Sequence, residues 1–461
     1  MRYRIRDLEA ESKFAAHLAV EAIGKAVSTE MIKGVLVDLG LMAQRERKLN
    51  GVVTVLLVIM MSIHANMSIG AVMEKVARGL RLIWPDPEWD VPGDSAISYR
   101  RYQLGARPLA ALFRQVCHPI ATPQTIGAFL FGLRAVAIDC TTENVADTKE
   151  NARAFGRPSN QYGASALPQV LCTYLIECGT HATLDAGFWP CHANPHKAAK
   201  RMLRSVVEGM LCMWDCGLHS YDLVSGVRRR KAHVLSRLSL QVRPRVRKRL
   251  RDGSYLADIS SYRTRRKHAS KIQVRIIEYR INDPGRPGHN QLHRLLTTLL
   301  DPVEYPILDL ICAYHERWEI ELAIDEMDTH QRLPNRPLRS LKPVGVIQEL
   351  YGLLIGHYAL RHLMHDAALQ AGIDPDRVSF VRGLNKLLDA VSEFQMVVPD
   401  QLPQLYERLL RDITQVILPP RRNRINPRVV RRRQVKFHCK QPWHYHWPQP
   451  TQAFREAIAL I

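Results

Sequence analysis

Three acidic residues have the types and sequence contexts that two-metal phosphoryl chemistry needs. Asp139 and Asp215 each directly follow a short apolar segment, and Glu321 lies in the segment 314–331, which contains no Gly or Pro. Carboxylate oxygens are hard ligands that suit Mg²⁺ or Mn²⁺. Two such ions about 3.5 to 4 Å apart activate the attacking oxygen and stabilise the leaving one. Chemistry of this kind requires no protein nucleophile.

The elements expected to position these acids are two strands and a helix. The apolar segments 135–138 and 210–214 predict strands, and open α/β sheets build their sites beyond the C-terminal ends of strands. The segment 314–331 predicts one helix, which Pro334 would stop. A solvated face with i,i+4 pairs is the alternative interpretation of its charges. At about 100° per residue, five side chains fall within about 80° of one face: Tyr314, Arg317, Glu321, Asp325 and Asp328.

The wider pattern predicts an α/β fold with a helical N-terminal region. Segment 49–73 has no charged residue, but Asn50 and Asn66 interrupt it, so we interpret it as a buried bundle helix and not a membrane span. Strands and a helix then follow one another, as in a mixed sheet flanked by helices. Five parts are predicted: 1–125, helical; 126–223, the first part of the α/β core; 224–305, a β-rich basic insertion; 306–372, the second part of the core with the Glu321 helix; and 373–461, a helical region with a basic tail.

The charge of the chain points to a polyanionic partner. Its formal net charge is +21 and its sequence pI is about 9.8. Such a field attracts nucleic acid first and anionic membrane second. The nine cysteines include no C-x-x-C pair, and the start lacks a signal peptide's apolar stretch, so we expect a reducing compartment. The basic residues concentrate in runs at 228–231, 243–251, 263–267 and 421–433.

Other chemistries find little support in the sequence. The phosphate-loop, dinucleotide-binding and nucleophile-elbow patterns are absent. Cys212, Cys216 and His219 could form a zinc site, although strand alternation also explains Cys212 as a buried residue. Asp185 is a rival for the second aspartate. We prefer Asp215, because it directly follows an apolar strand and a predicted helix.

Tyr314, Arg317 and Glu321 match the first three residues of a Tyr-x2-Arg-x3-Glu-x6-Lys signature. In this the chain resembles the DDE transposases of bacterial insertion sequences, specifically the insertion-sequence-four family. The resemblance implies an RNase H-like catalytic core with a β-rich insertion, and it implies that Asp139, Asp215 and Glu321 are a catalytic triad holding two Mg²⁺ or Mn²⁺ ions. Further segments that resemble the family's motifs are 45–49, 95–101, 104–113, 138–142, 147–151, 209–217, 221–223, 348–351 and 426–430.

By this resemblance the protein is expected to cut at the terminal inverted repeats of its element and to join the 3′-OH ends to target DNA. A hairpin intermediate, a synaptic complex of two subunits and a place in the bacterial cytoplasm at the nucleoid are also implied. An inactive DNA-binding relative and a nuclease without strand transfer remain as alternatives. The residues expected to contact DNA are Tyr314, Arg317, Arg228, Arg229, Arg230, Arg265, Arg266 and Lys267.

One position departs from the family signature in a way that bears on activity. Asp328 stands where the family has Lys, which reverses the sign of a group expected to lie against DNA phosphate. A negative charge about 4 Å from a phosphate would oppose its approach by about 1 to 4 kcal/mol. We therefore expect Asp328 to lower activity without disturbing the fold.

Overall fold

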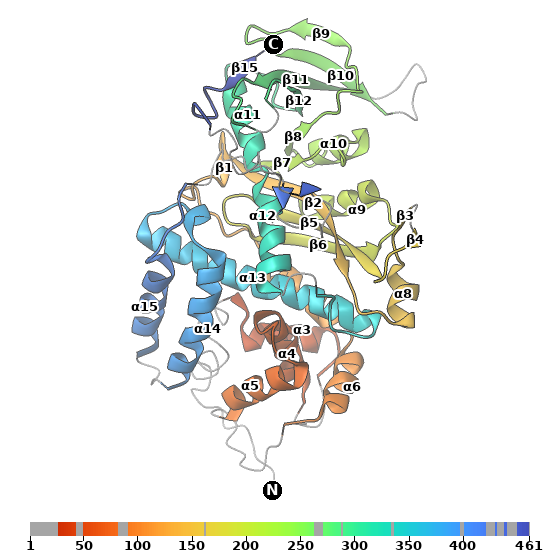
Figure 1. Cartoon of the computed structure of the whole chain (residues 1–461), viewed down its shortest axis with the longest axis vertical. Coiled ribbons are helices and arrows are strands. Elements are labelled where there is room, and N and C mark those ends of the chain that lie inside the picture. Colours follow the sequence, from red (N-terminus) through yellow and green to blue (C-terminus); the bar gives the residue numbers. More distant parts are fainter. Residues whose placement is uncertain are drawn as a thin grey trace. The chain divides into compact units, whose positions relative to one another are not determined.

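The computed structural model describes residues 26–42, 49–81, 91–160, 163–261, 271–286, 289–332, 336–396, 401–420, 429–430, 438–439 and 450–460. The chain forms two compact units (Figure 1). Unit 1 comprises Met1–Ala128, Cys140–Ala198 and Glu319–Pro419, and unit 2 comprises Phe129–Asp139, Ala199–Trp318 and Pro420–Ile461. The chain therefore passes between the units directly after Asp139 and directly before Glu319.

Unit 1 is mainly helical. Its N-terminal helices begin at side-chain caps: Ser28 accepts a hydrogen bond from the Met31 N–H, and Asn50 accepts one from the Val53 N–H. Segment 95–113 lies in two helices, because Gly105 has φ of 71° and ends the first. These helices are α3 (Thr29–Asp38), α4 (Gly51–Ile63), α5 (Ile69–Arg81), α6 (Asp94–Leu104) and α7 (Arg107–Val116).

Helix α4 forms the centre of this helical region. All thirteen of its residues are buried, which confirms the interpretation of segment 49–73 as containing a buried helix. It packs against the long helix α13 (Pro343–Ala371), where a Cβ on Gly352 would lie 2.7 Å from the Val58 carbonyl oxygen, so only glycine permits this close approach. Among the described residues, no helix has both the length and the apolar character to span a membrane.

The rest of unit 1 adds a β-hairpin and further helices. Strands β5 (Gln169–Glu177) and β6 (Thr183–Pro190) pair antiparallel through a buried turn, in which Gly179 and His181 have φ of 83° and 60°. The other elements are α8 (Lys149–Phe155), β3 (Ser159–Asn160), β4 (Gly163–Ala164), α12 (Glu319–Asp325), the π-helix η3 (Glu326–Gln331), the 3₁₀ helix η4 (Pro375–Arg377), α14 (Phe380–Met396) and α15 (Leu402–Thr414).

Unit 2 is built on a mixed sheet, as the α/β prediction requires. From β2 the strand order is β7-β8-β12-β11-β10-β9, with β2–β7 and β7–β8 parallel and the remaining pairs antiparallel. The strands of the predicted insertion 224–305 therefore continue the sheet that contains β7, each pairing with its neighbour in this order. The strands are β1 (Phe129–Leu130), β2 (Leu133–Asn144), β7 (Met210–Trp214), β8 (His233–Arg237), β9 (Val246–Arg249), β10 (Tyr255–Ser260), β11 (Lys271–Ile281), β12 (Leu292–Thr297) and β15 (Ile458–Leu460).

Several helices lie between the strands of unit 2 along the sequence. Helix α9 and strand β2 each begin in one unit and end in the other. A separate two-stranded parallel pair is formed by β13 (Val429–Val430) and β14 (His438–Cys439). The helices are α9 (Pro195–Met202), the 3₁₀ helix η1 (Leu203–Ser205), α10 (Tyr221–Arg228) and α11 (Ile307–Glu316).

The single helix predicted for 314–331 is wrong. Helix α11 ends at Glu316, and the N–H groups of Arg317 and Trp318 bond to carbonyls only three residues back. Helix α12 then runs to Asp325 and continues as the π-helix η3. The shared helix face calculated for the side chains from Tyr314 to Asp328 assumed one uninterrupted α-helix. The break after Glu316 and the π-helix change the rotation per residue, so these side chains do not share one face by that calculation.

Candidate active site

The first two predicted acids lie on neighbouring parallel strands of unit 2. Strands β2 and β7 are in register from Arg134 opposite Met210 to Ala137 opposite Met213. The same register, continued by two residues, sets Asp139 beside Asp215, at the spacing of about 4.8 Å that separates neighbouring strands. Asp139 and Asp215 therefore both come two residues after the last paired residues, Ala137 and Met213.

The sequence predicted that Asp139 would end its strand, and this prediction is wrong. Strand β2 continues to Asn144, and the residues after Asp139 belong to unit 1. There the Gln169 side-chain amide donates to the Asn144 side chain over 2.9 Å, and Cys140 Sγ lies 3.0 Å from Thr173 Oγ1. These contacts keep the strand extended beyond the apolar segment.

Asp215 is fixed by the turn that follows β7. Its Oδ1 accepts a hydrogen bond from the Leu218 N–H over 3.1 Å. A Cβ on Gly217 would lie 3.3 Å from both carboxylate oxygens, which is tighter than ordinary contact, so glycine here leaves room for the carboxylate. The side chain thus has one defined direction at the end of its strand.

Tyr314 and Arg317 join this pair within unit 2. Arg317 Nη1 lies 3.7 Å from Asp139 Oδ2, and its guanidinium lies 5.7 Å from the centre of the Tyr314 ring. Burial raises the pKa of Tyr314 to about 12, and the negative charge of Asp215 acts in the same direction. At neutral pH Tyr314 is therefore a neutral hydroxyl that can donate a hydrogen bond.

Arg237 completes this edge, although the sequence analysis missed it. Strand β8 is in parallel register with β7 up to Trp214 opposite Ser236. One further step sets Arg237 beside Asp215, with its side chain exposed. The sequence signal was a charged residue directly after the buried segment 234–236. Asp139 and Asp215 likewise come directly after the apolar segments 135–138 and 210–214.

Glu321 lies in unit 1, on α12, and is partly buried. It follows Arg317 by four residues, so at most about 14 Å of chain separates their Cα atoms. Among the residues that the structure describes, no three His, Cys, Asp or Glu side chains gather as a metal-binding group. The structure therefore places Asp139 and Asp215 after adjacent parallel pairs of unit 2, and it places Glu321 in unit 1.

The two rival sites have different surroundings. Cys212, the first residue of the possible zinc site, is fully buried in β7. Asp185 lies within β6 of unit 1 and is 2% exposed, which is less than expected for a ligand that must meet DNA. By contrast, Asp139 is 22% exposed.

Apart from Tyr314 and Arg317, the predicted DNA-binding residues fall into two groups. Arg228 and Arg229 are exposed at the end of α10, whereas Arg230 donates to the Gly226 carbonyl over 3.0 Å. Arg265, Arg266 and Lys267 lie outside the described residues. The basic run 243–251, which is not among these residues, contains β9, whose four residues are all exposed and which is the last strand in the order of the unit 2 sheet.

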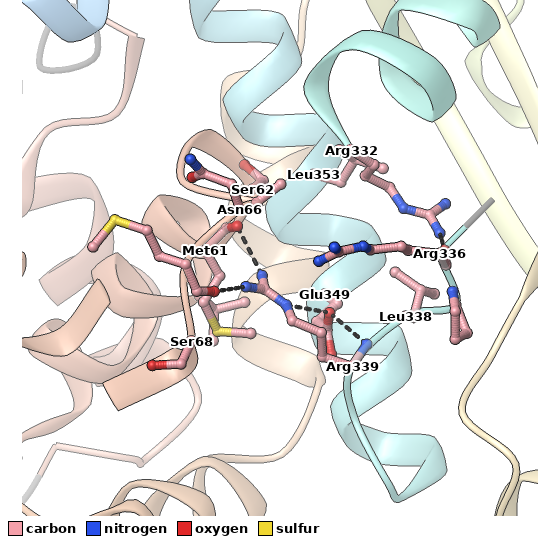
Figure 2. A pocket seen from close by; sticks show the side chains of 14 residues that line it. Met61, Ser62, Asn66, Ser68, Arg332, Arg336, Leu338, Arg339, Glu349 and Leu353 are labelled. Carbon is pink, nitrogen blue, oxygen red and sulfur yellow. Dashed lines mark hydrogen bonds and ion pairs between the residues drawn. The ribbon is translucent and has the colours of Figure 1, made fainter. Parts of the chain in front are cut away.

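A pocket of about 270 Å³ lies in unit 1 (Figure 2). Arg339 holds its wall by donating to the carbonyls of Met61 and Met67 over 2.8 and 3.0 Å, and its Nε lies 3.6 Å from Glu349. Arg332 and Arg336 also line it. None of the predicted catalytic residues lines this pocket, and all of its lining residues belong to unit 1.

Asp328 has partners that the sequence did not reveal. Its Oδ1 lies 3.9 Å from Arg332 Nη1, and Arg332 also bonds to Glu143. Burial, followed by the negative charge of Glu143, raises the pKa of Asp328 well above its usual value. The prediction that Asp328 opposes DNA phosphate stays a prediction, and the structure adds that its carboxyl lies near Arg332, which also bonds to Glu143.

Asp328→Asn is expected to stabilise the protein at neutral and alkaline pH. Because the folded-state pKa is raised above the ordinary value of 3.8, ionisation of Asp328 costs stability as the pH rises from that value through the folded-state pKa. The variant's melting temperature should exceed that of the parent by a few degrees at pH 8 and match it at acidic pH. Thermal melts across a pH series measure this.

Asp325→Asn is the control, because Asp325 is exposed on the same stretch and bonds to Thr329. It should leave the melting temperature nearly unchanged. A gain for Asp328→Asn that did not vary with pH would contradict a raised pKa of Asp328.

Comparison with known proteins identifies matches along most of the chain. Residues 17–114 match the family described as insertion element 4 transposase N-terminal, and residues 131–356 match the transposase DDE domain. The transposase InsG for insertion sequence element IS4 of Escherichia coli (strain K12) is 25% identical over 426 residues, covering 90% of this chain and 93% of that protein.

Two more distant similarities were found. The putative transposase InsZ of the same organism is 25% identical over 131 residues, which is 28% of this chain and 44% of that protein. A piggyBac transposase in a synaptic complex with hairpin DNA aligns over 88% of this chain and 85% of its own, with a TM-score of 0.40 and 13% identity.

Proposed function

Because the chain belongs to the insertion element 4 transposases with a DDE domain, we propose that it cuts DNA at the terminal inverted repeats of its own element. The freed 3′-OH ends would then be joined to target DNA. The observation that carries this proposal is the parallel register of β2 and β7, which sets Asp139 beside Asp215.

The donor set at this edge fits a divalent metal. Two carboxylates on adjacent strands supply the hard oxygen ligands that Mg²⁺ or Mn²⁺ prefers, and Asp139 is exposed enough for DNA to reach it. We assign Asp139, Asp215 and Glu321 as the residues that hold two ions. When bound, such ions polarise the phosphate, lower the pKa of an attacking water and stabilise the leaving oxygen.

Tyr314, Arg317 and Arg237 would bind and orient the scissile phosphate. Arg317 is 3.7 Å from Asp139, and Arg237 is one register step beyond Ser236, so both cations border the carboxylates. A guanidinium can donate two hydrogen bonds to one phosphate. Tyr314 keeps its proton at neutral pH and can donate to a phosphate oxygen.

Glu321 is proposed as the third ligand because of its place in the chain. Helix α12 begins two residues after Arg317, which itself contacts Asp139. The helix therefore starts two residues along the chain from a side chain that contacts Asp139. Glu321 is partly buried, as a metal ligand usually is.

Further features of the proposal follow from family membership. The α/β core would be RNase H-like, with 126–223 and 306–372 as its two parts and 224–305 as the inserted β-rich part. Residues 1–125 would bind end DNA. Two subunits would hold the two element ends in one complex.

Strand transfer separates this function from that of a nuclease with the same metal site. Given Mg²⁺ and pre-cut end DNA with a free 3′-OH, the protein should join these ends to a supercoiled plasmid, which gel electrophoresis of labelled ends detects. Glu321→Gln should join none. Cleavage of uncut ends without joining of pre-cut ends would assign the protein as a nuclease, and binding without either reaction would assign it as an inactive relative.

A further inference from the structure

We propose that a buried charged cluster in unit 1 acts as a clamp that sets the rotation of α12 and thereby the position of Glu321. The clamp consists of Glu319, Glu326, His181, His357 and Arg361, each at most 6% exposed. The role of Glu321 as a metal ligand rests on the proposed function. The clamp itself is a set of contacts within unit 1.

The two acids of the clamp bracket Glu321 in the sequence. Glu319 begins α12 and Glu326 directly follows its last residue. Seven residues correspond to about two turns, so these two side chains leave the helix on nearly the same side. Glu321 is two residues from Glu319, about 200° around the helix, and points to the opposite side. Holding one side of α12 therefore fixes the direction of Glu321 on the other.

His181 lies between the two acids. Its Nδ1 is 3.1 Å from Glu326 Oε1, and its Nε2 is 4.0 Å from Glu319 Oε2. Glu319 also accepts a hydrogen bond from the N–H of Gly179 in the same turn between β5 and β6. This turn cannot shift easily, because a Cβ on Gly179 would lie 2.8 Å from the Ala128 backbone nitrogen and His181 has φ of 60°.

Helix α13 supplies the other half of the clamp. Arg361 bonds to both carboxylate oxygens of Glu326, with Nε donating to Oε2 over 2.8 Å. His357 Nε2 lies 3.1 Å from the same Oε2. Although burial alone would raise the pKa of Glu326, Arg361 and His181 bring it well below its usual value, so the carboxylate is ionised.

The chemistry of the cluster points to positioning more than to stability. Buried ion pairs lose much of their attraction to desolvation, and apolar residues of similar volume often stabilise a protein as well or better. What directional hydrogen bonds add is one defined arrangement. A rotation of α12 by one residue, about 100°, would break the contacts of Glu319 and Glu326 together. The clamp thus selects one rotation of the helix that carries Glu321.

The test uses Glu326→Gln in the full-length protein. It keeps the shape of the side chain but removes the charge that Arg361 and the histidines face. Loss of a group that orients a metal ligand typically costs about 10–100-fold in metal affinity or activity. We expect kcat for cleavage of end DNA to fall by about this factor and the Mg²⁺ concentration for half-maximal rate to rise. The KM for end DNA should not change.

Glu349→Gln is the matched control. Glu349 is likewise a buried acid of unit 1 beside an arginine, with Arg339 Nε at 3.6 Å, but it lies on α13 (Figure 2). This variant should lower the melting temperature about as much as Glu326→Gln while keeping the parental kcat and Mg²⁺ requirement. Equal effects of the two variants on kcat and Mg²⁺ requirement would overturn the proposal.

A second variant covers the case in which Glu326→Gln does not fold. His181→Asn removes the ring between the two acids and keeps a residue type that tolerates positive φ. It should also raise the Mg²⁺ requirement, and parental kinetics would overturn the clamp. Glu321→Gln is measured in parallel. If that variant is active, the proposed metal site is wrong, whereas an inactive Glu321→Gln beside a parental His181→Asn would reject the clamp alone.

Discussion

Asp215→Ala is expected to abolish Mg²⁺-dependent cleavage of end DNA while leaving DNA binding nearly intact, and Asp139→Ala and Glu321→Ala should do the same. A metal ligand contributes several kcal/mol of transition-state stabilisation, and a loss of about 4 kcal/mol corresponds to about 10³-fold in rate. Binding should persist because it comes from arginine and lysine contacts to phosphate. Cleavage of labelled end DNA and gel-shift titration measure the two quantities.

Asp185→Ala is the control for this prediction. Asp185 was the rival for the second ligand, and it lies 2% exposed within β6. Its variant should retain cleavage at temperatures where it is folded. If Asp215→Ala cut normally and Asp185→Ala did not, the assignment of the second ligand would be reversed.

The second large effect expected is on DNA affinity as a function of salt. With Lys and Arg together numbering 65, binding should be dominated by phosphate contacts. Each contact adds about −0.9 to the slope of log K against log salt, so six to ten contacts lower the affinity by about 10³ to 10⁵ between 50 and 200 mM salt. Titration of end DNA at several salt concentrations measures the slope.

Strand β9 provides the variants for this measurement. Lys248→Gln and Arg249→Gln remove exposed charges from one strand, and each should reduce the slope by about 0.9. Arg408→Gln is the control, because Arg408 is exposed on α15 outside the basic runs and lies 3.8 Å from Glu393. A slope near zero for the parent would exclude phosphate contacts as the source of affinity.

The strands of the core were predictable because burial on both faces leaves a plain signal in the sequence. Segment 210–214 is continuously apolar and forms β7 with the predicted bounds. The predicted strand 135–138 lies within β2. The α/β class follows from these segments and from the helices that lie between strands in the sequence, such as α9 and α10.

The break after Glu316 could not be predicted from helix propensity. No Gly or Pro marks it, and the chain bends where Glu319 becomes buried and bonds to Gly179, about 140 residues earlier in the sequence. A contact between such distant residues overrides the local preference for a helix. The partners of Asp328 and Glu326 escaped prediction for the same reason.

Arg237 was missed for a different reason. The β-prone segment continues from residue 234 to residue 242, so the sequence alone does not place Arg237 at a strand end. The structure ends β8 at Arg237 and pairs it in parallel with β7. Parallel pairing puts the ends of neighbouring strands at one edge, but a single sequence does not state which strands are neighbours.

The exposed basic strand β9 has a consequence for solubility. It hydrogen-bonds to β10 on one side, and it ends the strand order of unit 2. An edge strand of this kind can recruit a second chain through its remaining backbone groups, and lysine or arginine side chains discourage such association by mutual repulsion. The DNA-free protein would therefore be kept from aggregating by the positive side chains of β9, which are Arg247, Lys248 and Arg249. Bound DNA phosphates would neutralise these charges, but the DNA would then itself cover the edge of the sheet.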